Sequence, residues 1–177
     1  MIIRHHRANG TSSRAAFSDC ETYRYSLTRV WDKEGPRVMF VMLNPSTADE
    51  TRNDPTVERC ERRARALDYG AFRVCNIFAY RATDPRDLRR AAAPEGPGNA
   101  AALRRGARWA DHIVAAWGAH GDHLDQGRRI AALLAGMRRP LFHLGLTKAG
   151  HPRHPLYLRY GQEPVLWVPF ATAKAGA

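Results

Sequence analysis

Apolar and polar residues alternate with a period of two in some segments of this chain and recur every three to four residues in others. A strict alternation, as at residues 23–31, is typical of a half-buried strand. A continuous apolar run, as at 38–43, is typical of a strand covered on both faces. Segments of these two kinds recur along the chain and predict one sheet. The predicted strands are 23–31, 38–43, 72–78, 112–118, 141–145 and 164–168.

Segments with helical periodicity lie between these strands. Apolar positions recur every three to four residues from Val57 to Leu67, so a helix that starts at Pro55 would pack one face on the sheet. Asp54 and Asp84 stand directly before prolines, which is typical of the N-cap of a helix. The predicted helices are about 55–69, a short helix that opens at 83–85, 99–109 and about 124–134.

The alternation of strands and helices predicts an α/β fold, a three-layer α/β/α sandwich with a largely parallel central sheet. Residues 1–20 are expected to be a flexible N-terminal lead, and residues 21–170 a single α/β domain. A chain of 177 residues with 44% apolar content can bury a core without disulfides or metal. No apolar run approaches the ~20 residues that span a bilayer. The start lacks the apolar stretch of a signal peptide, so we expect a cytoplasmic protein that does not contact a membrane.

Cysteine and histidine spacing argues against a bound metal. Cys20, Cys60 and Cys75 contain no CxxC pair and cannot all form disulfides, which fits a reducing compartment. The histidines lack the HExxH and HxxxH spacings that bring two ligands to one helix face. A glycine-rich phosphate loop is also absent, which disfavours nucleotide triphosphate and nicotinamide chemistry. We therefore expect neither a metal nor a cofactor.

The net charge predicts a phosphate-rich partner. Lys and Arg number 28 against 17 acidic residues, giving a formal charge of +11 and a pI near 10.4. Arginine forks match phosphate geometry, and binding to a polyanion releases its counterions, so single- or double-stranded DNA is the expected partner. A second explanation is open, because a GC-rich genome also produces an arginine- and alanine-rich composition.

Polar side chains follow the predicted strands and could share one crevice. Asn44 follows the second strand, Asn76 lies in the third, and His151 and His154 lie in a proline-rich loop near the end of the chain. The carboxyl ends of parallel strands meet at one edge of a sheet, where α/β enzymes place their sites. Asp49 is the carboxylate nearest to Asn44 that no helix cap explains, and it is the candidate general base.

Several of these motifs resemble one family of bacterial and phage proteins, the domain of unknown function 1643. The likeness covers about residues 20–160, and the family name implies no activity. The motifs that carry it are Arg24-Tyr25 with Leu27, Arg29 and Trp31; 43–49; 54–56; Arg59-Cys60; 76–83; Trp117-Gly118; and 154–158.

The order of elements is also similar, more distantly, to the uracil-DNA glycosylase superfamily. That resemblance implies an α/β/α fold and hydrolysis of the N-glycosidic bond of a base flipped out of DNA. Asn44-Pro45 matches the motif that positions the attacking water, and Asn76 matches the residue that binds the edge of the base. His154-Pro155 matches the loop that stabilises the departing base. His151-Pro152 precedes it, so either histidine could take that role.

The resemblance assigns roles to further residues. Phe78 or Tyr80 would stack on the base, and Leu156 or Leu158 would fill the gap left in the helix. Ser46, Thr47, Arg81, His151 and Arg153 would contact the nucleic acid. Two alternatives stay open: a hydrolase of free nucleosides or nucleotides on the same fold, and a non-catalytic basic module that binds DNA or RNA.

Overall fold

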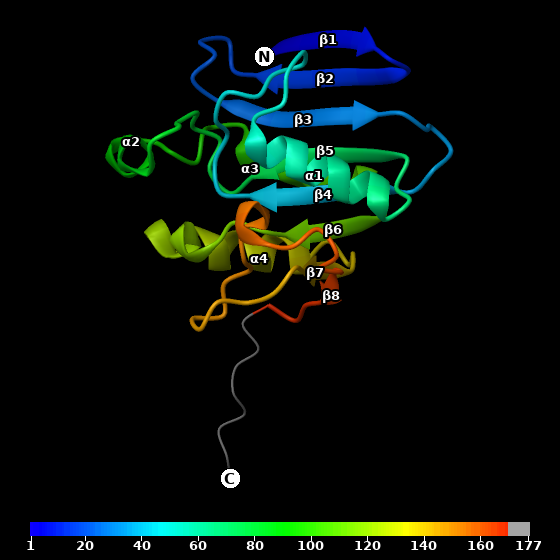
Figure 1. Cartoon of the computed structure of the whole chain (residues 1–177). Coiled ribbons are helices and arrows are strands. Elements are labelled where there is room, and N and C mark those ends of the chain that lie inside the picture. Colours follow the sequence, from blue (N-terminus) through cyan, green and yellow to red (C-terminus); the bar gives the residue numbers. More distant parts are fainter. Residues whose placement is uncertain (170–177) are drawn as a thin grey trace.

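The computed structural model of the chain describes residues 1–169. One eight-stranded sheet runs through the molecule, with helices on both of its faces (Figure 1). The strands are β1 (Ile2–Ala8), β2 (Thr11–Phe17), β3 (Arg24–Val30), β4 (Arg37–Met42), β5 (Ala71–Asn76), β6 (His112–Ala115), β7 (Leu141–His143) and β8 (Val165–Leu166). The helices are α1 (Pro55–Ala66), α2 (Pro85–Arg90), α3 (Asn99–Trp109) and α4 (Gln126–Ala135), with the 3-10 helices η1 (Ala119–Asp125) and η2 (Pro155–Tyr157).

The sheet is mixed, with the strand order β1-β2-β3-β5-β4-β6-β7-β8. Strands β5, β4, β6 and β7 pair in parallel, whereas β1, β2, β3 and β5 pair antiparallel, as do β7 and β8. The expected α/β class is correct, but the expectation of a largely parallel sheet is wrong. Two parallel strands of one sheet must be joined by a crossover connection, which is usually a helix. The short connection 31–36 between β3 and β4 contains no helix, so β3 is antiparallel to β4 and to the strands parallel with it.

Residues 1–20, expected as a flexible lead, instead form the hairpin of β1 and β2. Asn9 and Gly10 have φ values of 49° and 75°, as in the two-residue turns that join antiparallel strands. Strand β2 also pairs with β3, so that Ala15 and Phe17 are fully buried. An Asn-Gly pair between two extended segments is a hairpin signal, which the expectation of a flexible lead did not take into account.

The helices begin where their caps predict. The side chain of Asp54 accepts a hydrogen bond from Val57 N at 2.8 Å, and that of Asp84 accepts one from Arg86 N at 2.8 Å, which confirms both as N-caps. Helix α3 occupies the predicted residues, α1 ends three residues before the predicted end, and α4 starts two residues later than predicted because η1 precedes it. No helix within residues 1–169 is long and apolar enough to cross a membrane.

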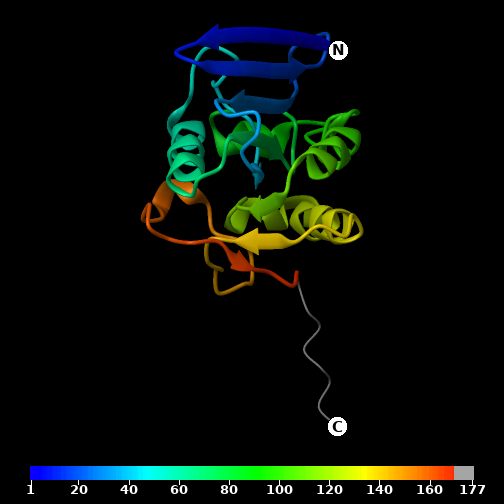
Figure 2. The same cartoon turned by 90° about the vertical axis from the view of Figure 1, so that its right-hand side faces the viewer.

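Strand β4 is buried on both faces, and this fixes the position of the loop that follows it. Val38, Phe40 and Met42 pack against α1, whereas Met39 and Val41 pack against α3 and α4. Figure 2, which views the sheet close to edge-on, shows α1 on one side and α3 and α4 on the other. A strand held in this way ends at a defined point, so the side chains that come after it are placed with little freedom.

Candidate functional site

A cavity of about 660 Å³ lies at the carboxyl ends of the parallel strands β4, β5 and β6. Its size is that of a small-molecule or cofactor site. The N-terminus of α1, the loop before η2 and η2 itself complete its wall. Eight of the residues predicted from the sequence line it: Asn44, Ser46, Thr47, Asn76, Arg153, His154, Leu156 and Leu158.

Two asparagines at neighbouring strand ends present amide groups to this cavity. The amide nitrogen of Asn44 donates to Ala82 O at 2.7 Å and to Pro45 O at 3.0 Å, so its donors are used and its Oδ1 is left to accept. Asn76 is 2% exposed and lines the cavity, and its main-chain carbonyl accepts from the side chain of Asn99, whereas no hydrogen bond joins its own side-chain amide to a described residue. A buried amide normally has partners, so the free amide of Asn76 indicates a ligand position.

His154 lies against the end of strand β6. A Cβ atom placed on Gly118 would lie 3.3 Å from the Cβ of His154, and Gly118 itself has a φ of 77° that favours glycine. Nδ1 of His154 accepts from Leu156 N at 3.3 Å, so the neutral ring carries its proton on Nε2. Burial lowers the pKa of His154 to about 4, while the negative charge of Asp54 acts in the opposite direction. At neutral pH the ring is therefore an uncharged donor.

Arg24 and Asp54 form a buried pair of opposite charges that line the same cavity. The backbone of Ala48 lies between them: its carbonyl accepts from Nη1 of Arg24 at 2.5 Å, and its N–H donates to Oδ2 of Asp54 at 3.4 Å. Burial lowers the pKa of Arg24 to about 10, and the charge of Asp54 acts against this shift. Arg24 therefore stays protonated at neutral pH.

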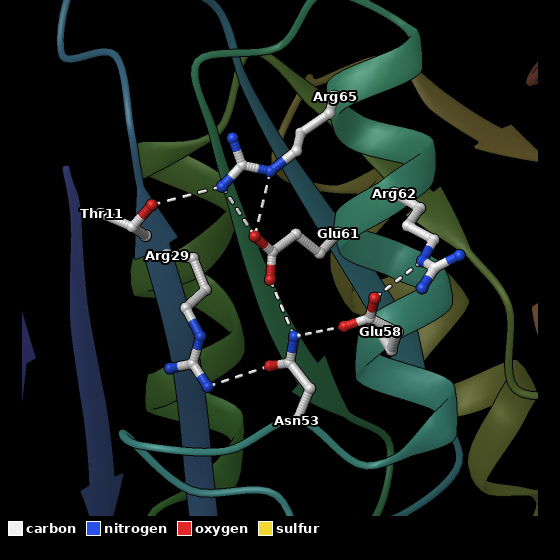
Figure 3. A network of polar contacts seen from close by, with 7 residues as sticks. All are labelled: Thr11, Arg29, Asn53, Glu58, Glu61, Arg62 and Arg65. Atoms are coloured by element: carbon white, nitrogen blue, oxygen red, sulfur yellow. Dashed lines mark hydrogen bonds and ion pairs between the residues drawn. The ribbon is translucent and has the colours of Figure 1, made fainter. Parts of the chain in front are cut away.

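A polar network holds the loop that joins β4 to α1 (Figure 3). Nη2 of Arg29, on β3, donates to Asp49 O at 2.7 Å and to Asn53 Oδ1 at 3.0 Å. The amide nitrogen of Asn53 donates to the carboxylates of Glu58 and Glu61 on α1 at 3.0 and 2.8 Å. The network ties β3, the loop and α1 together, and so fixes the N-terminus of α1 at the cavity.

Two arginines of α1 hold the segment that follows His154. Nη1 of Arg59 donates to Leu158 O at 3.0 Å. Arg63 is 1% exposed and donates to Arg159 O and Tyr160 O, both at 2.8 Å. These bonds to main-chain carbonyls fix the course of the chain without depending on its side chains.

Asp49, the predicted general base, does not line the cavity. Its Oδ1 accepts from Thr51 N, Thr51 Oγ1 and Arg52 N at 2.8, 2.7 and 2.9 Å, so it closes a local turn. Burial acts to raise the pKa of Asp49, but these hydrogen bonds outweigh it and lower the pKa overall. Asp54 is the carboxylate that lines the cavity.

Four other predicted site residues also lie outside the cavity lining. Phe78 is fully buried in the core beside α3 and α4, and Tyr80 packs edge-on against Tyr23. Arg81 lies over the ring of Phe17 and donates to a backbone carbonyl. His151 is buried, and its main chain bonds to Thr147. Phe78 lies in a bend two residues beyond the end of β5, and the packing of this bend buries its ring in the core, which its position in the sequence could not reveal.

The lining residues that the sequence reasoning missed include Arg24, Asp54 and Tyr157. From the sequence, Asp54 was interpreted only as a helix cap. A helix that follows a parallel strand begins at the carboxyl edge of the sheet, so its N-cap residue can also line a cavity at that edge. Tyr157 is 84% exposed at the cavity mouth, with its ring centroid 6.2 Å from that of His154. Nothing in the sequence marks Arg24 as buried.

The described residues show no metal centre. No group of three or more His, Cys, Asp or Glu side chains within residues 1–169 is placed to hold a metal ion. The cavity therefore offers hydrogen-bond donors, an amide, a carboxylate and a guanidinium as its chemical groups.

A family model described as a protein of unknown function, DUF1643, matches residues 24–156. The chain belongs to this family. The matched segment runs from Arg24 to Leu156 and so includes most of the cavity lining, although its description names no activity. No curated protein and no solved structure matches the chain.

Proposed function

We propose that this member of the family is a base N-glycosylase that acts on nucleic acid. The observation that carries the proposal is one cavity lined by an uncharged histidine donor, an unpaired buried amide and a carboxylate, namely His154, Asn76 and Asp54. Hydrolysis of an N-glycosidic bond needs a donor for the departing base, a group that binds the base and a group that accepts a proton from water. The resemblance of the 44–49 and 154–158 motifs to the uracil-DNA glycosylase superfamily supports the same reaction.

His154 would stabilise the departing base. When the bond between the sugar C1′ and the base nitrogen breaks, its electron pair stays on the base, which leaves as an anion. The Nε2–H of the neutral imidazole can donate a hydrogen bond to this anion, and the ring does not need a positive charge to do so. Such a donor contributes most where water is excluded, so His154, which is half-buried, would contribute most when a bound base fills the cavity.

Asn44 and Asp54 would handle the attacking water. The free Oδ1 of Asn44 can accept one hydrogen bond from the water and so orient it. The carboxylate of Asp54 would take the second proton as the water oxygen bonds to C1′, and its charge would also stabilise the positive charge that develops on the sugar. The products are the free base, which takes up a proton, and an abasic sugar.

The surface around the cavity suits a nucleic acid. Arg153 lines the mouth and is exposed, and the chain carries a formal charge of +11. Tyr157 projects from the same edge, whereas Leu156 and Leu158 are half-buried. We therefore assign to Tyr157 the contact with the bases next to the flipped nucleotide, since an exposed aromatic ring can stack on any base.

Base excision is the direct test. The purified chain is incubated with single- and double-stranded oligonucleotides that contain deaminated or modified bases, and alkali-labile abasic sites are measured. Binding of the same DNA is measured by fluorescence between about 50 and 200 mM salt, where a polyanion contact weakens steeply. Excision supports the proposal. Binding without excision indicates a DNA-binding module, and cleavage of free nucleosides alone indicates the small-molecule hydrolase of the same fold.

A further inference from the structure

Arginine side chains from β2, β4 and β5 gather on the face of the sheet that α3 covers. Arg14 of β2 is the register partner of Thr28 on β3, and Thr28 is that of Arg73 on β5, so the three side chains project from one face in a row. Nε of Arg73 donates to Thr28 Oγ1 at 2.9 Å. The guanidinium carbon of Arg73 lies 4.2 Å from the centroid of the Trp109 ring, at the end of α3, and that of Arg37 lies 5.6 Å from the same ring.

Arg105, on the exposed side of α3, belongs to the same cluster. Burial lowers the pKa of Arg73, Cys75 acts in the opposite direction, and the positive charges of Arg14, Arg105 and Arg37 lower the pKa further. Arg37 and Arg105 are exposed, whereas Arg14 and Arg73 are half-buried. We call these four residues, Arg14, Arg37, Arg73 and Arg105, the arginine face.

Acidic side chains do little to neutralise the arginine face. The strands β1 to β5 and helix α3 contain no aspartate or glutamate. Of the four arginines, Arg37 alone forms an ion pair within residues 1–169, with the half-exposed Asp111 at 3.6 Å. On α1, by contrast, Arg62 and Arg65 each pair with a glutamate one turn earlier. The charge of the arginine face is therefore available to a partner, and that partner must be an anion.

The chemistry of the arginine face favours a nucleic acid among anionic partners. A guanidinium can bind a phosphate through two parallel hydrogen bonds. The four groups are held on three strands of one sheet, in which neighbouring strands lie about 4.8 Å apart, and on α3, so they form a fixed array. A lipid surface is normally bound with apolar side chains as well, but no large apolar residue of β1 to β5 or α3 is exposed. A nucleic acid repeats its phosphates along the chain and needs no such residues.

We propose that the arginine face is a second nucleic-acid contact of this protein, which binds the phosphodiester backbone away from the cavity. None of its four arginines lines the cavity, whose wall includes the N-terminus of α1 on the other side of the sheet (Figure 2). This contact goes beyond the proposed function, because it involves neither a flipped base nor excision. Contacts to the backbone carry no sequence information, so the arginine face gives the chain affinity for undamaged nucleic acid.

The salt dependence of binding tests the arginine face. Binding of a fluorescein-labelled undamaged duplex is measured by anisotropy between about 50 and 200 mM salt, with the unmodified chain and with the double variant Arg14→Gln/Arg105→Gln. Each phosphate contact contributes about 0.9 to the slope of log affinity against log salt concentration, so the double variant should reduce the slope by about 2. Its affinity at about 100 mM salt should fall at least about tenfold. An unchanged slope, or an unmodified chain that does not bind the duplex, overturns the inference.

Arg62→Gln/Arg129→Gln is the matched control. It removes the same number of charges from two exposed arginines outside the arginine face, which pair with Glu58 and Glu95. The slope should stay nearly unchanged, because these charges are already balanced by an acidic neighbour. Equal losses in the two double variants would show an effect of net charge alone and would also overturn the inference.

Phenylglyoxal, which reacts with arginine side chains, gives a measurement that needs no variant. Bound duplex should protect Arg37 and Arg105 of the unmodified chain and leave Arg62 and Arg129 reactive, as read by mass spectrometry of the digested protein. Absence of protection at the arginine face contradicts the contact. Tighter binding of polyglutamate than of DNA with equal charge would assign the face to an acidic peptide instead.

Excision is measured separately on the same samples. A salt slope that depends on the arginine face, without excision of any base, leaves this contact standing and removes the glycosylase. Excision by a chain whose slope is the same in Arg14→Gln/Arg105→Gln does the reverse.

Discussion

The backbone N–H of Leu156 donates a hydrogen bond of 3.3 Å to Nδ1 of His154. This bond fixes the proton of the neutral ring on Nε2, and burial lowers the pKa of the ring to about 4. We therefore predict that the His154 ring is in the Nε2–H form at pH 7 and titrates near pH 4. Nitrogen-15 NMR of the histidine rings measures both. A midpoint near 6.5, the ordinary histidine value, would show that His154 is not buried as described.

The low pKa of His154 should also make stability depend on pH. Because the pKa is about 4 in the folded chain and 6.5 for an ordinary histidine, the folded state binds fewer protons than the unfolded state between these values. The free energy of unfolding then falls as the pH falls through this window, by about 3 kcal/mol at most. Urea unfolding at pH 7 and pH 4.5 measures the fall, which should be smaller in His154→Asn.

His154 and His151 should differ in their effects on excision. The Nε2–H of His154 would act mainly on the charge of the departing base, so His154→Ala should lower the rate by ~10²–10³ and leave DNA affinity nearly unchanged. His151 does not line the cavity, and His151→Ala should keep turnover per folded molecule. Single-turnover rates, corrected for folded protein by circular dichroism, compare the two. An inactive His151→Ala with an active His154→Ala would place the leaving-group contact three residues earlier.

Much of the secondary structure can be predicted from sequence patterns within a few residues. The features that could not be predicted depend on contacts between segments that lie far apart in the sequence. The caps at Asp54 and Asp84 and the strand at 38–43 are predictable because proline spacing and apolar runs act within a few residues. Asn44, Asn76 and His154 converge because parallel strands share a carboxyl edge.

Other features carry no local signal. The burial of Arg24 depends on the pairing of β3 with β5, which a list of strands does not reveal. The exclusion of Asp49 from the cavity depends on a turn closed by its own carboxylate, and loop geometry of this kind varies with a single hydrogen bond. Sequence position alone could therefore locate the site at one sheet edge, but could not choose between neighbouring carboxylates in one loop.

Arg63 should contribute strongly to stability. Its guanidinium donates to the carbonyls of Arg159 and Tyr160, and Arg63→Met would leave these groups without their donor. We expect a loss of about 3 kcal/mol in the free energy of unfolding. Arg62→Met is the matched control, because Arg62 is exposed and its ion pair within residues 1–169 is with Glu58, four residues earlier. This variant should cost no more than about 0.5 kcal/mol. Equal losses in urea unfolding would contradict the role of Arg63.

The two aspartates of the β4–α1 loop give the sharpest comparison for catalysis. Asparagine caps a helix as well as aspartate does, so Asp54→Asn should preserve α1 through the bond from Val57 N. It removes the carboxylate's charge, its ability to accept a proton and the long 3.4 Å bond from Ala48 N. We expect the excision rate to fall by ~10²–10⁴, the usual contribution of a general base. Asp49→Asn keeps an oxygen that can accept from Thr51 and Arg52 and lies outside the cavity lining, so excision should be nearly unchanged. The comparison is informative because the two residues lie five positions apart in one loop and, of the two, Asp54 lines the cavity whereas Asp49 does not. A large loss in Asp49→Asn with normal turnover in Asp54→Asn would return the general base to the position expected from the sequence.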